Sequence, residues 1–337
     1  MDKISPDVRK LYPLKFQPFY KERVWGGTQM RDVLGRDVPQ SAVPVGEAWE
    51  ITDREDAESV VANGELAGTG INELLKLYRK DLVGSRGMKF ERFPLLVKLI
   101  DAGDKLSLQV HPDENSCREL GGGAEPKTEM WYVISALPGA KIMAGLNRKA
   151  TRLQIMELLD SPEIVSQLQV YNSQPGDAFF IASGTLHAIG AGNLILEIQQ
   201  NSDTTYRISD WGRVGSDGKP RELHREKGLK STSFTNRATS RIPGVVNQTS
   251  FNRKFDVVTL CPFFKVADLR LTSDWIDRTT GDSFHLLSSV CNPFAVGNGE
   301  CMVEAAPGET VLIPASFGAY TIKPLLATGA TVVKTTL

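Results

Sequence analysis

The chain has 337 residues, of which 41% are hydrophobic and 23% charged, so its composition is that of an ordinary globular protein and excludes wholesale disorder. Thirty-nine Lys and Arg residues balance forty Asp and Glu residues, which leaves a net charge of -1. No overall field therefore attracts nucleic acid or an anionic membrane, and an anionic ligand would need a local group of cations. The length allows two domains.

The first residues and the cysteines indicate where in the cell the protein is located. Residues 1–10 are charged and hold no apolar stretch, and no run approaches the ~18 apolar residues of a membrane-spanning helix. The cysteines show neither a metal-binding spacing nor a disulfide framework; they are Cys117, Cys261, Cys291 and Cys301. We therefore predict a cytoplasmic protein with no membrane or nucleic-acid partner.

Most of the sequence is typical of short strands separated by Gly, Pro, Asn and Asp. Apolar residues at helical spacing predict a helix over 70–83, and apolar runs predict strands over 93–101 and 131–135. A second helical pattern covers 151–170, and alternation predicts a strand over 263–271. Many strands with few helices favour a mainly β fold, a sandwich or barrel in which helices are insertions.

One segment of the chain occurs twice. PGDAFFIASGTLHAIG at 175–190 and PGETVLIPASFGAYTI at 307–322 align without a gap at an offset of 132 residues. Each copy begins with a Pro-Gly turn and an acid and continues as an apolar strand. We therefore predict two copies of one β-domain. His187 of the first copy aligns with Ala319 of the second, so a site that needs this histidine exists only in the first domain.

The domain boundary is predicted from composition. Residues 231–254 are rich in Ser, Thr, Asn and Arg and contain a Pro-Gly pair, which is typical of a linker. We predict a metal-binding catalytic domain over 1–245, with helical insertions, and a second domain without the metal site over 246–337.

Three predicted strands bring potential metal ligands together. Strand alternation places Ser107, Gln109 and His111 on one face, Glu129 begins a second apolar strand, and His187 ends a third. Polar side chains are costly to bury in apolar strands unless they have partners. Two histidines, a carboxylate and an amide suit Zn²⁺, Fe²⁺, Mn²⁺ or Co²⁺, and the spacing does not choose among these metals.

Several cations accompany this candidate metal site. Lys98 lies inside the apolar strand at 93–101 and Lys127 lies two residues before Glu129. The stretch 201–213 contains an acid, several hydroxyls and Arg207, a pattern that also fits a simple capped turn. Lys98, Lys127 and Arg207 together could hold a phosphate or carboxylate.

The order of these motifs resembles the type I mannose-6-phosphate isomerases, also called phosphomannose isomerases, of the cupin superfamily. The resemblance covers most of the chain and includes the following segments: WGG at 25–27, GEAWE at 46–50, FPLLVK at 93–98, LSLQVHP at 106–112, KTEMWY at 127–132 and GTLHA at 184–188. It implies two cupin-type jelly-roll domains and one zinc ion per chain. The length fits the short bacterial branch, which lacks a large helical insertion.

The resemblance also implies roles for single residues. The implied zinc ligands are Gln109, His111, Glu129 and His187. Arg207 is implied as the catalytic arginine and Asp203 as an acid in proton transfer, and Glu47 is a second candidate for that transfer. The implied substrate-side residues are Lys98, Ser107, Lys127 and Trp25, where Trp25 also fits a plain core residue. Aldose–ketose isomerisation through a cis-enediol agrees with this set, because the metal and Arg207 can stabilise an oxyanion while a carboxylate moves the proton.

Two alternatives use the same residues. An Fe²⁺ dioxygenase of the cupin type would use His111, Glu129 and His187 as a facial triad, although Gln109 and the cations argue against it. A sugar-phosphate-binding protein without activity would keep Lys98 and Lys127. One departure from the family pattern is Pro126, which stands where longer members carry a histidine to which ring opening is ascribed.

Overall fold

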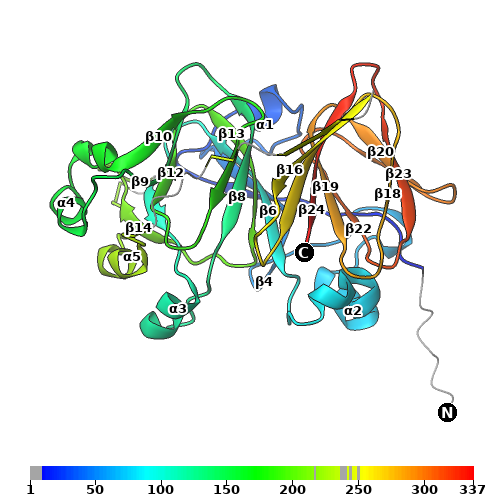
Figure 1. Cartoon of the computed structure of the whole chain (residues 1–337), viewed down its shortest axis with the longest axis horizontal. Coiled ribbons are helices and arrows are strands. Elements are labelled where there is room, and N and C mark those ends of the chain that lie inside the picture. The colour runs from blue at the N-terminus through cyan, green and yellow to red at the C-terminus, as the bar shows by residue number, and fades with distance from the viewer. Residues whose placement is uncertain (1–9, 216–217, 236–240, 243–244, 249–250) are drawn as a thin grey trace, which may run out of the picture. The chain divides into compact units, whose positions relative to one another are not determined.

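The computed structural model describes residues 10–337 except 216–217, 236–240, 243–244 and 249–250, and of 245–248 only the backbone. The chain forms two compact units that are interleaved along the sequence (Figure 1). The first unit consists of the described residues in 19–49 and 95–243. The second unit consists of the described residues up to Pro18, of Glu50–Pro94 and of the described residues in 244–337.

Two antiparallel sheets form the first unit. The six-stranded sheet has the order β11(Ala178–Ile181), β8(Glu129–Ala136), β13(Asn193–Gln200), β6(Leu95–Ala102), β3(Val45–Ile51) and β2(Phe19–Glu22). The five-stranded sheet has the order β10(Leu168–Asn172), β9(Lys141–Leu146), β12(His187–Ile189), β7(Leu108–Val110) and β14(Tyr206–Ser209). The helices of this unit are α1(Gln29–Asp32), α3(Glu114–Leu120), α4(Arg152–Glu157), the 3-10 helix Pro162–Gln167 and α5(Arg225–Ser231).

The core of the first unit lies between its two sheets. Trp131, Phe179 and Ile195 of the six-stranded sheet form one buried cluster with Ile142 and Ile189 of the five-stranded sheet. The outer face of the five-stranded sheet is covered by helices, because side chains of α4, of the 3-10 helix and of α5 are buried against β7, β12 and β14. Figure 1 shows α4 and α5 beside this sheet. In the five-stranded sheet, apolar side chains thus alternate between a face that packs in the core between the sheets and a face that packs under the helices.

The second unit repeats this plan with two antiparallel sheets. The seven-stranded sheet has the order β1(Leu14–Lys15), β22(Thr310–Ile313), β19(His285–Cys291), β24(Ala330–Thr336), β17(Lys265–Leu271), β16(Asn252–Val258) and β15(Val245–Gln248). The four-stranded sheet has the order β18(Trp275–Arg278), β23(Ala319–Pro324), β20(Phe294–Gly297) and β21(Met302–Ala305). The remaining elements are β4(Asp53–Arg54), β5(Ala57–Glu58), the 3-10 helix Gly64–Leu66 and α2(Ile71–Gly87).

The predicted mainly β fold of paired jelly-roll sheets is confirmed, and so is the repeat. The two copies form strands at the same offset, since β11 and β22 begin at residues 178 and 310 and β12 and β23 at 187 and 319. The helix predicted over 70–83 is α2, whose apolar face is buried. No helix in the described part of the chain is long and apolar enough to cross a membrane.

One prediction about an element was wrong. The helix predicted over 151–170 ends at Glu157 and is followed by a separate 3-10 helix that begins at Pro162, because proline cannot continue a helix from the preceding turn. In the segment predicted as a linker, 231–254, the boundary between the two units falls at 243/244, and β15 and part of β16 follow it within the segment. Residues 236–240 of that linker lie outside the described residues.

The domain division at residue 245 does not describe the interleaving. The described residues up to Pro18 and the segment Glu50–Pro94 belong to the second unit because β1 pairs with β22 and α2 packs in that unit. Strand pairing with a segment about 300 residues away leaves no local sequence signal.

Candidate active site

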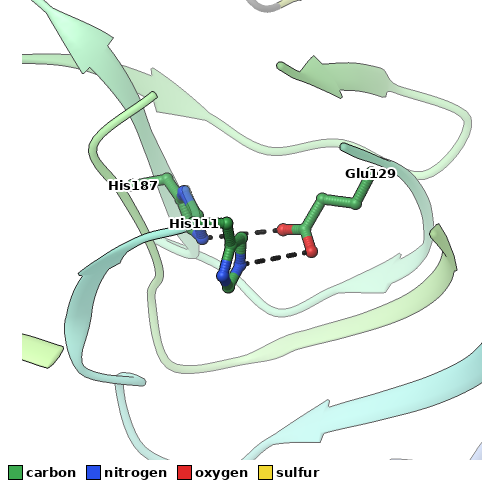
Figure 2. Close-up of side chains that lie close together, drawn as sticks. All are labelled: His111, Glu129 and His187. Atoms are coloured by element: carbon green, nitrogen blue, oxygen red, sulfur yellow. Dashed lines mark ion pairs between the residues drawn. The ribbon is translucent and has the colours of Figure 1, made fainter. Parts of the chain in front are cut away.

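Two histidines and a glutamate from three strands converge in the first unit. His111 directly follows β7, Glu129 begins β8 and His187 begins β12. Their ligand atoms all lie within 4.8 Å of one another, and all three residues are buried. Figure 2 shows both imidazole rings facing the carboxylate, with Nε2 of His111 3.4 Å from Oε2 and Nε2 of His187 3.5 Å from Oε1. Among the described residues this is the one such group of His, Cys, Asp or Glu.

The geometry of this cluster fits a divalent metal ion. Nδ1 of His111 donates to the carbonyl of Thr204 and Nδ1 of His187 donates to the carbonyl of Thr185, both at 2.8 Å. These hydrogen bonds fix each ring and leave the Nε2 lone pair facing the carboxylate, which is the usual arrangement around a protein-bound metal. Ligands about 2.0–2.1 Å from a tetrahedral metal are roughly 3.4 Å apart, close to the separations found here.

The charge states of the cluster also suit a metal. Burial lowers the pKa of His187 to about 3 and lowers the pKa of His111, so both rings are neutral near pH 7. The pKa of Glu129 lies well below its usual range because the charge of Lys127 outweighs its burial. Nζ of Lys127 lies 2.8 Å from Oε2 of Glu129, whereas Oε1 is buried without a hydrogen-bond partner among the described residues. A buried carboxylate oxygen with no hydrogen bond of its own can coordinate a metal ion.

Gln109 stands next to this cluster. It pairs with His187 across β7 and β12, and its side-chain Nε2 lies 3.3 Å from Nε2 of that histidine. Rotation of the amide by 180° turns its oxygen to the same place, where it can act as a fourth ligand. Ser107 donates a 3.2 Å hydrogen bond to Gln109 Oε1. Ser107 and Gln109 of the predicted shared face are therefore in contact with each other.

The sequence suggested that His187 ends a strand, whereas it begins β12. The turn before β12 explains this position. Gly184 has a φ of +82°, a conformation that favours glycine, and its N–H donates to the carbonyl of His111 at 2.8 Å. This bond holds the turn against the end of β7. It thereby places the two histidines side by side, with ring centroids 4.8 Å apart.

A cavity of about 490 Å³ adjoins the cluster. Every predicted catalytic and substrate residue lines it, together with Gln109: Trp25, Glu47, Lys98, Ser107, Lys127, Asp203 and Arg207. Trp25 is 3% exposed and belongs to the core as well, so its two interpretations are compatible. Residues separated by up to 182 positions in the sequence are thus brought to one cavity.

Comparison with known proteins identifies the family. The sequence profile of the phosphomannose isomerase type I catalytic domain matches residues 13–131. A probable mannose-6-phosphate isomerase of Bacillus subtilis is 34% identical over 315 residues, which cover 93% of this chain and 96% of the relative. The chain belongs to the type I phosphomannose isomerases, a family of enzymes. A mannose-6-phosphate isomerase of Streptococcus mutans is 41% identical over 64% of this chain and 66% of its own length.

The fold agrees with this family. The crystal structure of the Bacillus subtilis mannose 6-phosphate isomerase superposes with a TM-score of 0.86 at 30% identity, over 97% of this chain and 100% of that one. A mannosephosphate isomerase structure from Archaeoglobus fulgidus, described as putative, has the same fold at 22% identity and a TM-score of 0.74.

Four charged residues that line the cavity were missed by the sequence analysis: Glu22, Arg23, Glu197 and Arg221. Glu197 lies opposite Lys98 on β6 and accepts a 3.1 Å hydrogen bond from Nε1 of Trp131. Burial raises the pKa of Glu197, as does the charge of Glu129. In the sequence, Glu197 is a carboxylate inside an apolar strand, which is the same kind of signal that singled out Lys98.

Glu47 has a different environment from Glu197. Arg23 donates to both of its oxygens, at 2.8 and 3.2 Å, and Nε1 of Trp49 donates to Oε2 at 2.7 Å. Its pKa is lowered to about 2, because the charges of Lys98 and Arg23 and these hydrogen bonds outweigh burial. The GEAWE segment thus produces a permanently ionised carboxylate that holds Arg23 in place.

Arg207 is held by the segment that follows β14. Its backbone N–H donates to Nδ1 of His224 at 3.2 Å, and its Nη1 donates to the carbonyl of Glu222 at 2.9 Å. Burial lowers the pKa of His224, so a neutral ring can accept this bond. His224 therefore helps to position Arg207. Nε of Arg207 is buried and has no hydrogen-bond partner among the described residues.

The repeat locates the same positions in the second unit. The strand partner of Glu129 recurs 132 residues later as Ile313, whose own partner is His285. His187 corresponds in the same way to Ala319. The position of Glu129 thus corresponds to His285, that of Gln109 to Arg278 and that of His187 to Ala319.

Proposed function

We propose that the protein interconverts mannose 6-phosphate and fructose 6-phosphate. The observation that supports this proposal most directly is the His111, Glu129 and His187 cluster beside a cavity lined by cations, in a chain that belongs to the phosphomannose isomerases. The cavity volume of about 490 Å³ lies in the range of small-molecule sites.

Zn²⁺ is the proposed metal, one ion per chain, held by Gln109, His111, Glu129 and His187. Neutral imidazoles and one carboxylate are ligands that zinc binds readily, with the amide oxygen as the fourth ligand. A bound divalent ion would supply Lewis acidity at the sugar oxygens on C1 and C2. The second unit has Ala319 where His187 stands, so we propose that it binds no catalytic metal.

The reaction needs a group that removes a proton from C2 and returns one to C1. The electrons of the C2–H bond form the C1=C2 bond of an enediol while the electrons of the C1=O double bond move to O1, which takes up a proton and becomes an enediol hydroxyl. Protonation at C1 and loss of the hydroxyl proton on O2 then give the ketose. A carboxyl group whose pKa is raised is suited to both transfers.

Glu197 meets this requirement better than Glu47. The pKa of Glu197 is raised by burial, whereas that of Glu47 is lowered to about 2, which makes Glu47 a weak base. Asp203 also lines the cavity and stays a candidate. We therefore propose Glu197 or Asp203 as the proton carrier and assign Glu47 to positioning Arg23.

Arg207 is proposed to stabilise the enediolate. It lies opposite Gln109 on β7, next to the candidate metal ligands, and its unpartnered Nε is available to an oxyanion. We propose that Lys98, Ser107 and Lys127 contact the sugar hydroxyls and that Trp25 forms the apolar wall of the cavity.

The test is a coupled assay with mannose 6-phosphate on protein whose metal content has been measured. We expect one divalent ion per chain, turnover that chelation abolishes, and solvent deuterium at C1 of the product, as an enediol requires. Turnover without any exchange would favour a hydride shift. Oxygen consumption without isomerisation would contradict the proposal and favour the dioxygenase alternative.

A further inference from the structure

Three arginine side chains meet at the cavity. Arg23 comes from the residue after β2, Arg207 from β14 and Arg221 from the segment that follows β14, and all three line the cavity. Burial lowers the pKa of Arg207 most, and the charges of Arg221 and Arg23 lower it further, so the three cations lie close together. Like charges gathered at a cavity are stabilised by an anion.

Arg221 is held firmly and still has free donors. Its Nε and Nη2 donate to the two oxygens of Asp210, at 2.8 and 2.5 Å, and the Asp210 side chain is only 5% exposed. A guanidinium group has five N–H groups. In the part of the chain that the structure describes, Nη1 of Arg221 has no hydrogen-bond partner. The pair with Asp210 therefore orients the guanidinium and leaves three N–H groups for a ligand, two on Nη1 and one on Nη2.

Arg23 has the same kind of support. Its Nε and Nη2 donate to Glu47, and its Nη1 donates to the carbonyl of Glu22 at 3.0 Å, which leaves two N–H groups without a partner among the described residues. Gly46 makes this position possible, since a Cβ atom there would lie 2.6 Å from Cβ of Arg23. The glycine of the GEAWE segment thus allows β3 to approach Arg23 closely.

The two lysines of the cavity are less suited to a phosphate group. The side chains of Lys98 and Lys127 are only 6% and 4% exposed. Each faces a buried carboxylate, since Lys98 lies 3.5 Å from Glu197 and Lys127 lies 2.8 Å from Glu129. Each lysine places its single ammonium nitrogen beside a buried acid, whereas the guanidinium groups of Arg23 and Arg221 keep N–H groups beyond those that pair with their carboxylates.

We propose that Arg23 and Arg221 bind the phosphate group of the substrate through their free N–H groups, while Arg207 faces the reacting end of the sugar. The proposal rests on the proposed function, because it assigns the phosphate end of the same substrate. It replaces our sequence-based interpretation that Lys98 and Lys127 hold the phosphate.

The experiment compares Arg221→Gln and Arg23→Gln with the wild-type holoenzyme. We expect each variant to raise KM for mannose 6-phosphate about 10- to 100-fold and to change kcat by less than about threefold, since the phosphate is bound equally in the ground and transition states. Inorganic phosphate, titrated calorimetrically, should bind the wild type and lose a similar factor in each variant. Arg241→Gln is the matched control, because Arg241 also pairs with an aspartate, Asp177, and does not line the cavity.

Arg221→Lys guards against a folding defect in Arg221→Gln. It keeps a cation beside Asp210 and removes the free Nη1, so we expect folded protein with an intermediate KM. An unchanged KM and unchanged phosphate affinity in folded Arg221→Lys and Arg23→Gln would overturn the proposal. If the wild type bound phosphate through these arginines but did not isomerise mannose 6-phosphate, the proposed function would fail and the phosphate site would stand.

Discussion

Replacement of Lys127 by Met tests how charge is balanced in the cluster. Nζ of Lys127 lies 2.8 Å from Glu129 Oε2 and 3.2 Å from His111 Nε2, and the lysine and glutamate side chains are 4% and 0% exposed. Met fills a similar volume but leaves Glu129 charged and uncompensated in metal-free protein. Breaking one partner of a buried ion pair costs about 3–5 kcal/mol. For a unit of roughly 150–250 residues, that loss corresponds to a decrease in Tm of about 6–20 °C.

The expected loss depends on the metal. A bound divalent cation supplies the charge that Lys127 supplied, so with saturating Zn²⁺ the decrease in Tm should shrink to a few degrees. Thermal unfolding of wild type and Lys127→Met, each in chelator and in zinc, gives the four values needed. Lys98→Met is the matched control, since Lys98 pairs with Glu197 outside the cluster and its loss should lower Tm whether or not metal is present.

Two results would refute this reasoning. A metal-free Lys127→Met protein that melts at the wild-type temperature would show that Lys127 does not stabilise the charge of Glu129. An equal decrease in Tm with and without zinc would show that the metal does not bind at Glu129. The first result would also restore the interpretation of Lys127 as a residue that serves only the substrate.

The remaining predictions concern three residues. His187→Ala should lose metal and activity together, whereas His285→Ala should keep the metal; full metal content in His187→Ala would show that the ligand assignment is wrong. Arg207→Ala should lower kcat about 10²- to 10³-fold with a smaller effect on KM, and Arg207→Lys should recover part of it, as steady-state kinetics will report. Burial, followed by the charge of Lys334, lowers the pKa of His285 to about 4. Below pH 6.5 His285 is therefore protonated in the unfolded chain while it is still neutral in the folded chain. Stability should therefore fall between pH 6.5 and pH 4, by about 2 kcal/mol from this group at pH 5, and urea unfolding of His285→Gln should lack that contribution.

The metal cluster could be predicted from the sequence because its signal is local. Gln109, His111 and Glu129 are polar residues in or beside short apolar strands, and strand periodicity alone fixes the face on which they lie. The same signal would have found Glu197, which stands in the apolar run NLILEIQQ, had it been applied to acids as it was to Lys98.

The arginines of the cavity could not be predicted in this way. Arg221 lies in a charged segment whose sequence is that of any solvated loop, and only its pair with Asp210 places it at the cavity. Arg23 depends on Gly46 and Glu47, two residues on the neighbouring strand. Contacts of this kind follow from strand pairing. The strands within the segment 231–254 also depend on pairing, because β15 is the edge strand of its sheet and pairs with β16.

The interleaving of the two units has a consequence for synthesis on the ribosome. All residues of the first unit have been made once residue 243 is added, whereas β1 of the second unit pairs with β22, Leu14 opposite Leu312. β1 is thus synthesised first but can pair with β22 only near the end of synthesis, after all residues of the first unit have been made. An expression fragment cut at residue 245 would separate β1 and α2 from the sheets they complete, so the shorter unit is best produced as part of the whole chain.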